Sequence, residues 1–167
     1  MPDEHNREVA RALSLSLKTL SRKSRTRHEM VSILEKKGFS GDTISKSLAK
    51  LEDLGYIDDR NYAYNYAVSK ATERLWGSRR IRVELGRRGI STEIVESILK
   101  RLKDEIDEES LLEKAIRKKL HLLRVDSSEK SYRRLYNYLM RRGFSASSVM
   151  ERIRKWKVMD ERDDEIG

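Results

Sequence analysis

Cationic side chains stand in clusters along the chain, and their types and spacing point to the binding of anions. Each arginine guanidinium can hold a phosphate or a carboxylate through two parallel hydrogen bonds, and a row of such groups could follow a phosphate backbone. The formal net charge of +9 favours nucleic acid or another polyanion as a partner, although solubility alone would also account for it. The residues that we predict to bind a polyanion are Arg22, Lys23, Arg25, Arg27, Arg79, Arg80, Arg82, Arg87, Arg88, Arg117, Lys118, Lys119, Arg133, Arg134, Arg141 and Arg142.

The position of a cluster within its helix bears on whether it serves binding or helix stability. Basic pairs end three predicted helices, at 36–37, 87–88 and 141–142. Cations in a last helical turn offset the helix dipole by about 0.3–1 kcal/mol, so both interpretations stay open for these pairs. The cluster Arg79–Arg82 stands at a predicted helix start, where cations oppose the dipole, and there binding is favoured. The same preference applies to the group at 22–27.

The residue patterns of most catalytic and metal sites are missing from the sequence. It has neither a G-x-x-x-x-G-K-[ST] phosphate loop nor a G-x-G-x-x-G turn, and it contains no cysteine. The three histidines are scattered, so a zinc site is not expected. Asp58 and Asp59 could in principle hold magnesium, but their place at a predicted helix start favours capping. We therefore expect no catalytic residue, no metal and no cofactor.

A five-residue pattern recurs three times and predicts how these clusters are positioned. Two basic residues, a glycine, a large apolar residue and a serine occur around Gly38, Gly89 and Gly143. Apolar residues recur before and after each glycine in steps of three and four, which is the period of one helix face. Each glycine is therefore predicted to end one helix in a left-handed conformation, and each following serine to cap the next helix.

Another helical stretch precedes each of these helix pairs, so that the repeat is a unit of three helices. The preceding stretches cover 6–21, 60–75 and 108–123, and in the first of them the predicted buried stripe is Val9, Leu13, Leu17 and Leu20. Thr26 with Glu29 fits a capping box at the start of the next helix. We predict an all-α chain of three tandem, helix-turn-helix-like repeats in an elongated, curved array. The expected boundaries are 1–56, 57–105 and 106–167, and the last repeat ends in a short acidic tail, or in the start of a further unit, at 160–165.

Aromatic residues lie among the cations. Tyrosines at 56–66 and 132–138 could stack on bases, although core packing with an exposed hydroxyl is favoured. Trp156 occupies a repeated core position and is predicted to be structural. Trp76 ends a helix, and its role stays open.

Three stretches of this sequence resemble the RecX family of bacterial recombination regulators. Arg25–Met30 with Lys37–Phe39 is similar to the family's first conserved block, and threonine 26 stands where serine is commoner. The stretch 56–63 is similar to its aspartate-pair block, and 77–90 to its middle block. The resemblance covers about residues 10–103, and the last third matches mainly by the register of the repeat.

The resemblance implies a bowed, elongated molecule that modulates RecA recombinase, mainly as an inhibitor. Such proteins lie in the groove of the RecA–DNA filament, contact single- and double-stranded DNA, and act on recombination, repair and the SOS response. Because no apolar run is long enough to span a membrane and no signal peptide is evident, we expect a cytoplasmic protein with no membrane partner. We also expect a monomer.

Two other functions remain open from the sequence. A short glycine turn between helices is also typical of helix-turn-helix transcription regulators, although no dedicated dimerisation helix is evident. An adaptor that binds protein alone would show no salt-dependent affinity for DNA.

Overall fold

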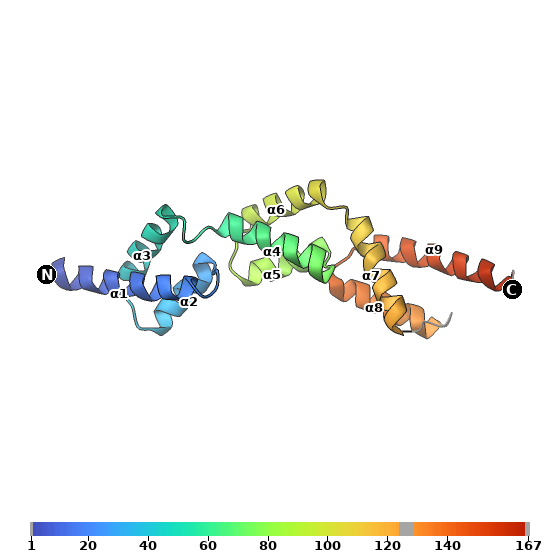
Figure 1. Ribbon diagram of the computed structural model, residues 1–167, viewed down its shortest axis with the longest axis horizontal. Coiled ribbons are helices and arrows are strands. Elements are labelled where there is room, and N and C mark those ends of the chain that lie inside the picture. Colours follow the sequence, from blue (N-terminus) through green and yellow to red (C-terminus); the bar gives the residue numbers. More distant parts are fainter. Residues whose placement is uncertain (1, 124–128, 166–167) are drawn as a thin grey trace. The chain divides into compact units, whose positions relative to one another are not determined.

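The described chain is all-α, as predicted. The computed structural model describes residues 2–123 and 129–165, and within these the side chains of 4–121 and 129–156. The described residues form the helices α1 (Pro2–Leu20), α2 (Arg27–Lys36), α3 (Gly41–Asp53), α4 (Asp59–Arg74), α5 (Ser78–Arg87), α6 (Thr92–Glu105), α7 (Glu108–Leu123), α8 (Glu129–Arg142) and α9 (Ala146–Glu165) (Figure 1).

The glycine turns have the predicted conformation in all three repeats. Gly38, Gly89 and Gly143 have φ angles of +82°, +74° and +87°, which residues with a side chain rarely adopt. The serine two positions on caps the following helix each time. The side-chain oxygen of Ser40 accepts from the N–H of Thr43 at 3.3 Å, and Ser145 accepts from Ser148 at 3.1 Å.

The first helix differs from the prediction in extent and in its buried face. Helix α1 begins at Pro2 rather than at residue 6. Its most buried side chains are Ala12 and Ser16, and the Ser16 hydroxyl donates to the carbonyl of Ala12 at 2.8 Å. Leu17, which the periodicity placed in the core stripe, is 39% exposed. Small residues on this face let α1 lie close to α3.

The core positions predicted from the repeat are buried in each copy. Eight and four residues before each glycine, the apolar side chains are fully or almost fully buried, and those six and ten residues after it are at most 7% exposed. Trp156, thirteen residues after Gly143, is partly buried. The residues at the first four positions are Met30, Ile81 and Leu135; Leu34, Leu85 and Leu139; Ile44, Val95 and Val149; and Leu48, Leu99 and Ile153.

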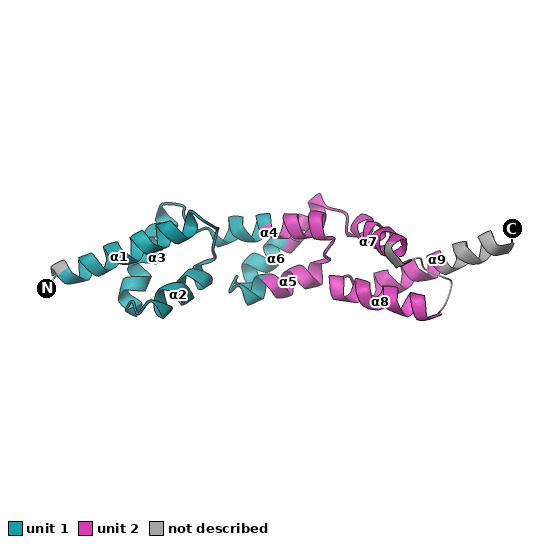
Figure 2. Cartoon of the chain, turned by 60° about the horizontal axis from the view of Figure 1, so that its bottom comes forward, with its two compact units in different colours: residues 1–65, 85–98 teal, residues 66–84, 99–167 magenta. Residues whose placement is uncertain are grey.

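The chain divides into two compact units whose boundaries pass through the second repeat. Unit 1 holds residues 1–65 and 85–98, and unit 2 holds residues 66–84 and 99–167 (Figure 2). The boundaries fall inside α4, α5 and α6. One part of the second repeat therefore packs with the first repeat in unit 1, and the other part packs with the third repeat in unit 2.

Candidate binding surface and repeat junctions

In unit 1, the amino-terminal end of α2 is closed by residues of the second repeat. Thr26 and Glu29 form the predicted capping box, in which the Thr26 hydroxyl oxygen accepts from the N–H of Glu29 at 3.1 Å. The same hydroxyl donates to the carbonyl of Arg88 at 2.7 Å. The Glu29 carboxylate lies 3.9 Å from the Arg88 guanidinium, and Asp59 accepts from the N–H of Arg27 at 2.8 Å. We call this set of contacts the first junction.

In unit 2, the amino-terminal end of α5 is closed in the same way by the third repeat. The N–H groups of Gly77 and Arg79 donate to the carbonyls of Arg142 and Gly143, at 2.8 and 3.2 Å. The Arg80 guanidinium donates to the carbonyl of Arg141 at 3.0 Å. These contacts form the second junction. In both units the carboxyl-terminal carbonyls of one helix therefore meet donors at the start of another, which satisfies groups that a helix end leaves unpaired.

The two residues of each acidic pair, Asp58–Asp59 and Asp107–Glu108, bind the starts of two different helices. Asp58 and Asp107 cap their own helices, because they accept from the N–H groups of Asn61 at 2.9 Å and Ser110 at 3.1 Å. The next acidic residue reaches the junction instead. Asp59 binds α2 as described, and Glu108 accepts from both the N–H and the hydroxyl of Ser78, at 2.8 and 3.1 Å. Capping was predicted for Asp58 and Asp59, but the contact with the neighbouring repeat was not.

Trp76, whose role the sequence left open, belongs to the second junction. The Arg80 guanidinium lies over its ring, 3.9 Å from the centroid, and Tyr66 meets it edge-on at 6.5 Å. A guanidinium over an indole face is attracted by the ring's negative electrostatic potential. The Trp76–Arg80 pair therefore holds the start of α5 against the end of α8.

Helix α8 carries a row of exposed side chains that could follow a phosphate backbone. Lys130, Arg134, Tyr138 and Arg141 lie within a narrow sector of the helix, and the three cations are exposed. We call these four residues the α8 stripe. Tyr138 is flanked by the charged groups of Lys119 and Arg142, at 5.1 and 5.0 Å from its ring centroid.

The spacing of the α8 stripe suits a nucleic-acid strand. Positions four apart on a helix are about 6 Å apart along its axis, and the nucleotides of one B-DNA strand rise about 3.4 Å each. Lys130 and Arg134 could therefore meet alternate phosphates, and Arg141, about 10 Å further along the axis, could meet the third phosphate beyond. Lys130 was not among the cations predicted to bind a polyanion, although its spacing of four residues from Arg134 indicates that the two share one helix face.

The chain matches, in order, the models of the three RecX three-helix domains, at residues 12–51, 58–99 and 107–151. It is 33% identical over 141 residues to the regulatory protein RecX of Chlorobium phaeobacteroides (strain BS1), which covers 84% of this chain and 90% of that protein. The chain belongs to the RecX family.

Other RecX proteins support the same assignment. The regulatory protein RecX of Mycolicibacterium smegmatis is 33% identical over 153 residues, which cover 89% of this chain and 80% of that protein. The crystal structure of RecX from Lactobacillus salivarius superposes with a TM-score of 0.78 at 25% identity, over 92% of this chain and 99% of that one. The tandem three-helix fold is thus that of RecX.

Several cations predicted to bind a polyanion are engaged within this RecX chain. Besides Arg80 and Arg88, Arg27 pairs with Glu52 at 3.0 Å, and Arg117 pairs with Glu113 at 3.1 Å. Arg25 lies 3.9 Å from Glu29, and Arg142 donates to the carbonyl of Arg74. The remaining cations of the prediction are exposed except for Lys119, which is half-buried beside Tyr138; the exposed ones are Arg22, Lys23, Arg79, Arg82, Arg87, Lys118, Arg133, Arg134 and Arg141.

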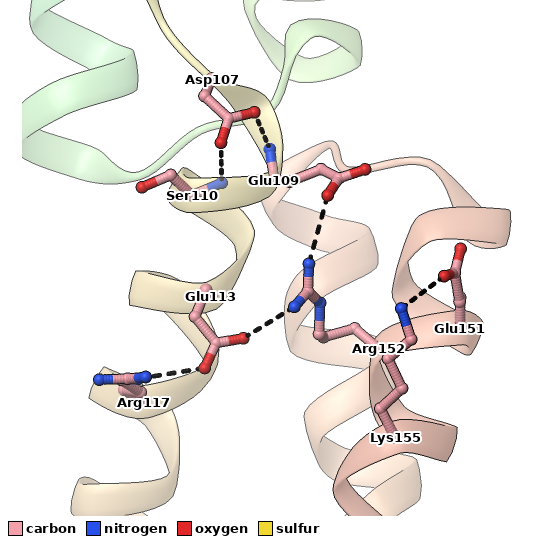
Figure 3. A network of polar contacts seen from close by, with 8 residues as sticks. All are labelled: Asp107, Glu109, Ser110, Glu113, Arg117, Glu151, Arg152 and Lys155. Carbon is pink, nitrogen blue, oxygen red and sulfur yellow. Dashed lines mark hydrogen bonds and ion pairs between the residues drawn. The ribbon is translucent and has the colours of Figure 1, made fainter.

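A network of ion pairs in the third RecX domain shows how a basic residue becomes structural. The Arg152 guanidinium lies between the carboxylates of Glu109, at 3.4 Å, and Glu113, at 3.6 Å (Figure 3). Since Glu113 also pairs with Arg117, one carboxylate holds two cations. These contacts connect α7 to α9. Because the two carboxylates compensate the charge of Arg152, this residue attracts an anionic ligand less strongly.

Within the described part of the chain, no group of three or more histidine, aspartate or glutamate side chains is arranged to hold a metal ion. The described helices also include none that is long and apolar enough to cross a lipid bilayer.

We expect Arg80→Ala to destabilise the second junction. The substitution removes the stack on Trp76 and the charged hydrogen bond to the carbonyl of Arg141, which together contribute about 1–2 kcal/mol at a partly exposed site. For a chain of this size that corresponds to a melting temperature lower by roughly 3–6 °C. Thermal unfolding followed by circular dichroism measures it, and Arg79→Ala is the matched control because Arg79 is exposed. Equal effects of the two substitutions would contradict the role of Arg80.

The first junction contains a carboxyl group whose ionisation opposes folding. Burial is the main cause that raises the pKa of Asp59, the nearby carboxylates of Asp58 and Glu29 add to it, and the N–H of Arg27 counteracts it. A raised pKa in the folded state contributes stability that is present below the unfolded pKa and is lost as the pH rises through the folded value.

We therefore expect Asp59→Asn to gain stability relative to the unsubstituted chain as the pH rises from about 4. Asparagine keeps an oxygen that can accept from Arg27 but carries no charge. The measurement is the difference in melting temperature between the two proteins from pH 3.5 to pH 7. Asp53→Asn, at an exposed position, is the control. A difference that falls with pH would show that the charge of Asp59 stabilises the junction.

Proposed function

We propose that this protein is a non-enzymatic regulator of RecA recombinase, mainly an inhibitor, that binds the RecA–DNA filament. The observation that carries the proposal is the complete and ordered set of three RecX domains, in a chain whose relatives are named regulatory proteins. In this proposal the protein acts in the cytoplasm as a monomer without a cofactor, and it influences recombination, repair and the SOS response.

The mechanism that we propose is electrostatic and steric. The α8 stripe meets the phosphates of the DNA within the filament, because its cations are exposed and spaced along one helix face. Other helix faces contact RecA. A protein that binds one state of the filament better than another shifts the population toward that state, and a protein lying in the groove also blocks access to it.

The alternative of a helix-turn-helix transcription regulator is disfavoured in the first two repeats by the charge of the helices that would read DNA. In such regulators the first residues of the second helix contact base edges. Two of the three equivalent helices, α3 and α6, carry Asp42 and Glu93 in their first turns, whereas α9 has no acidic residue there. A hydrogen bond from Lys46 lowers the pKa of Asp42, and hydrogen bonds from the backbone N–H of Glu93 and from Ser91 lower the pKa of Glu93. Both groups are therefore charged at neutral pH and would repel phosphates.

The test of the proposal is the rate of ATP hydrolysis by RecA on single-stranded DNA. We expect the rate to fall when the protein is added in amounts stoichiometric with its filament sites. An unchanged rate, together with no binding of the protein to preformed filaments, would contradict the proposal. Competition with DNA of mixed sequence addresses the alternative, because a preference above roughly 10³-fold for one sequence would indicate a transcription regulator.

A further inference from the structure

The three glycine turns are equivalent in sequence and conformation, but among the described residues the start of a helix contacts the turns at Gly89 and Gly143 and not the turn at Gly38. A β-carbon built on Gly89 would lie 2.3 Å from the β-carbon of His28, and one built on Gly143 would lie 2.3 Å from the backbone nitrogen of Arg80. These two turns are thus in close contact with the start of a helix, α2 in unit 1 and α5 in unit 2.

The first turn, at residues 36–40, presents the same groups to open space. A β-carbon on Gly38 would meet nothing within 4 Å, and residues 35–38 are all exposed. The carbonyl before the glycine accepts at both junctions, from the Thr26 hydroxyl and from the N–H of Gly77. The equivalent carbonyl in the first turn is that of Lys37.

We propose that the turn at residues 36–40 binds the amino-terminal end of a capped helix on a RecA subunit of the filament, which rests on the function proposed above. At the first junction the occupant is a helix that begins with a Thr–x–x–Glu capping box. Its threonine hydroxyl meets the carbonyl of Arg88, and its glutamate lies beside the Arg88 guanidinium. Lys37 occupies the position of Arg88 in the first repeat. The expected ligand is therefore a helix with a hydroxyl at its cap and a carboxylate in its first turn, because these groups complement the free carbonyl and the cation.

A second copy of this chain is a poorer occupant of the turn. The helices α2 and α5 begin three residues before Met30 and Ile81, and the second repeat or the third closes each start. Helix α8 begins six residues before the equivalent Leu135, so that its start lies about one helical turn earlier in the sequence than the starts of α2 and α5. The position that would have to receive a turn from another copy is thus within α8 rather than at a helix start.

A cross-linking experiment tests this contact directly, because the chain contains no cysteine. Lys37→Cys carrying a benzophenone maleimide is mixed with RecA filaments on single-stranded DNA and irradiated. We expect the cross-link to map to the first turn of a RecA helix. Lys50→Cys is the control, because Lys50 is exposed in the last turn of α3, away from the glycine turn. Cross-links only to DNA, only between copies of the protein, or equally from both cysteines would overturn the proposal.

Charge reversal supplies a second, independent measurement. Lys36→Glu with Lys37→Glu is compared with Lys18→Glu with Lys50→Glu, since all four lysines lie in or next to the last turn of a helix and the change in net charge is the same. We expect the first variant to bind filaments at least tenfold more weakly than the control, while the two bind free DNA within about twofold of each other. Equal filament affinities would overturn the docking proposal and leave the RecA function standing. Unsubstituted protein that does not bind filaments would overturn both.

Discussion

Alanine at Gly89 or Gly143 is expected to destabilise the protein far more than alanine at Gly38. All three positions have positive φ, where a residue with a side chain costs about 1–2 kcal/mol. At Gly89 and Gly143 the new β-carbon also overlaps an atom 2.3 Å away, whereas at Gly38 it enters open space. Because overpacking of this kind costs about 1–3 kcal/mol more, we expect totals of about 2–5 kcal/mol against 1–2 kcal/mol.

Thermal unfolding by circular dichroism distinguishes these effects. The two junction variants should melt at least about 6 °C below the unsubstituted chain, and Gly38→Ala by roughly half of that or less. The effects at the two positions should be similar, since the β-carbon of His28 and the backbone nitrogen of Arg80 are both fixed by the backbone and cannot rotate away. Similar melting temperatures for all three variants would mean that the turns are constrained by φ alone and that the junctions contribute little.

Removing the three cations of the α8 stripe should weaken DNA binding strongly without unfolding the chain. We expect Lys130→Ala with Arg134→Ala and Arg141→Ala to lower the affinity for single-stranded DNA by about 10- to 100-fold at low salt. Each lost phosphate contact should also reduce the dependence of log K on log salt by about 0.7, hence by roughly two for the triple variant. Helical circular dichroism should be unchanged, because these side chains are exposed.

The control for this variant removes the same charge from exposed lysines of the first repeat, by Lys18→Ala with Lys36→Ala and Lys50→Ala. If the two triple variants lose affinity equally and show the same salt dependence, binding follows net charge and the stripe has no special role. A larger effect of the control would place the DNA contact on the first repeat instead.

The local architecture could be predicted from the sequence because its causes are local. A glycine after a basic pair requires positive φ, a serine two residues later can accept from the next helix, and apolar steps of three and four define a buried face. Each of these determinants acts within a few residues. The capping box at Thr26 and the turns at Gly38, Gly89 and Gly143 were therefore found in the structure as expected.

The junctions could not be predicted because their hydrogen bonds use backbone carbonyls and N–H groups, or join residues that are far apart in the sequence. The carbonyls of Arg88 and Arg142 leave no trace in a residue pattern, and the acceptor Asp59 looks like an ordinary helix cap. For the same reason the cations at 25, 27, 80, 88, 117 and 142 could not be separated from those of an open surface. The cations were visible in the sequence, whereas their pairing with particular carboxylates, carbonyls and aromatic rings was not.

The first helix was misjudged for a related reason. Periodicity weights large apolar residues such as Leu17, but the close approach of two helices favours small ones, and Ala12 and Ser16 take that place. Ser16 is polar by composition, yet its hydroxyl bonds within its own helix and can be buried at little cost.

The unequal chemistry of the two junctions makes the repeats impossible to interchange. Deleting the second repeat by engineering would bring the turn at Gly143 against the start of α2, which supplies the hydroxyl of Thr26 in place of the N–H groups of Gly77 and Arg79 and the guanidinium of Arg80. Such a shortened protein would lose bonds that no neighbouring group replaces. The order of the repeats is thus fixed by the junctions, because the donors and acceptors of each junction match those of the adjacent repeat.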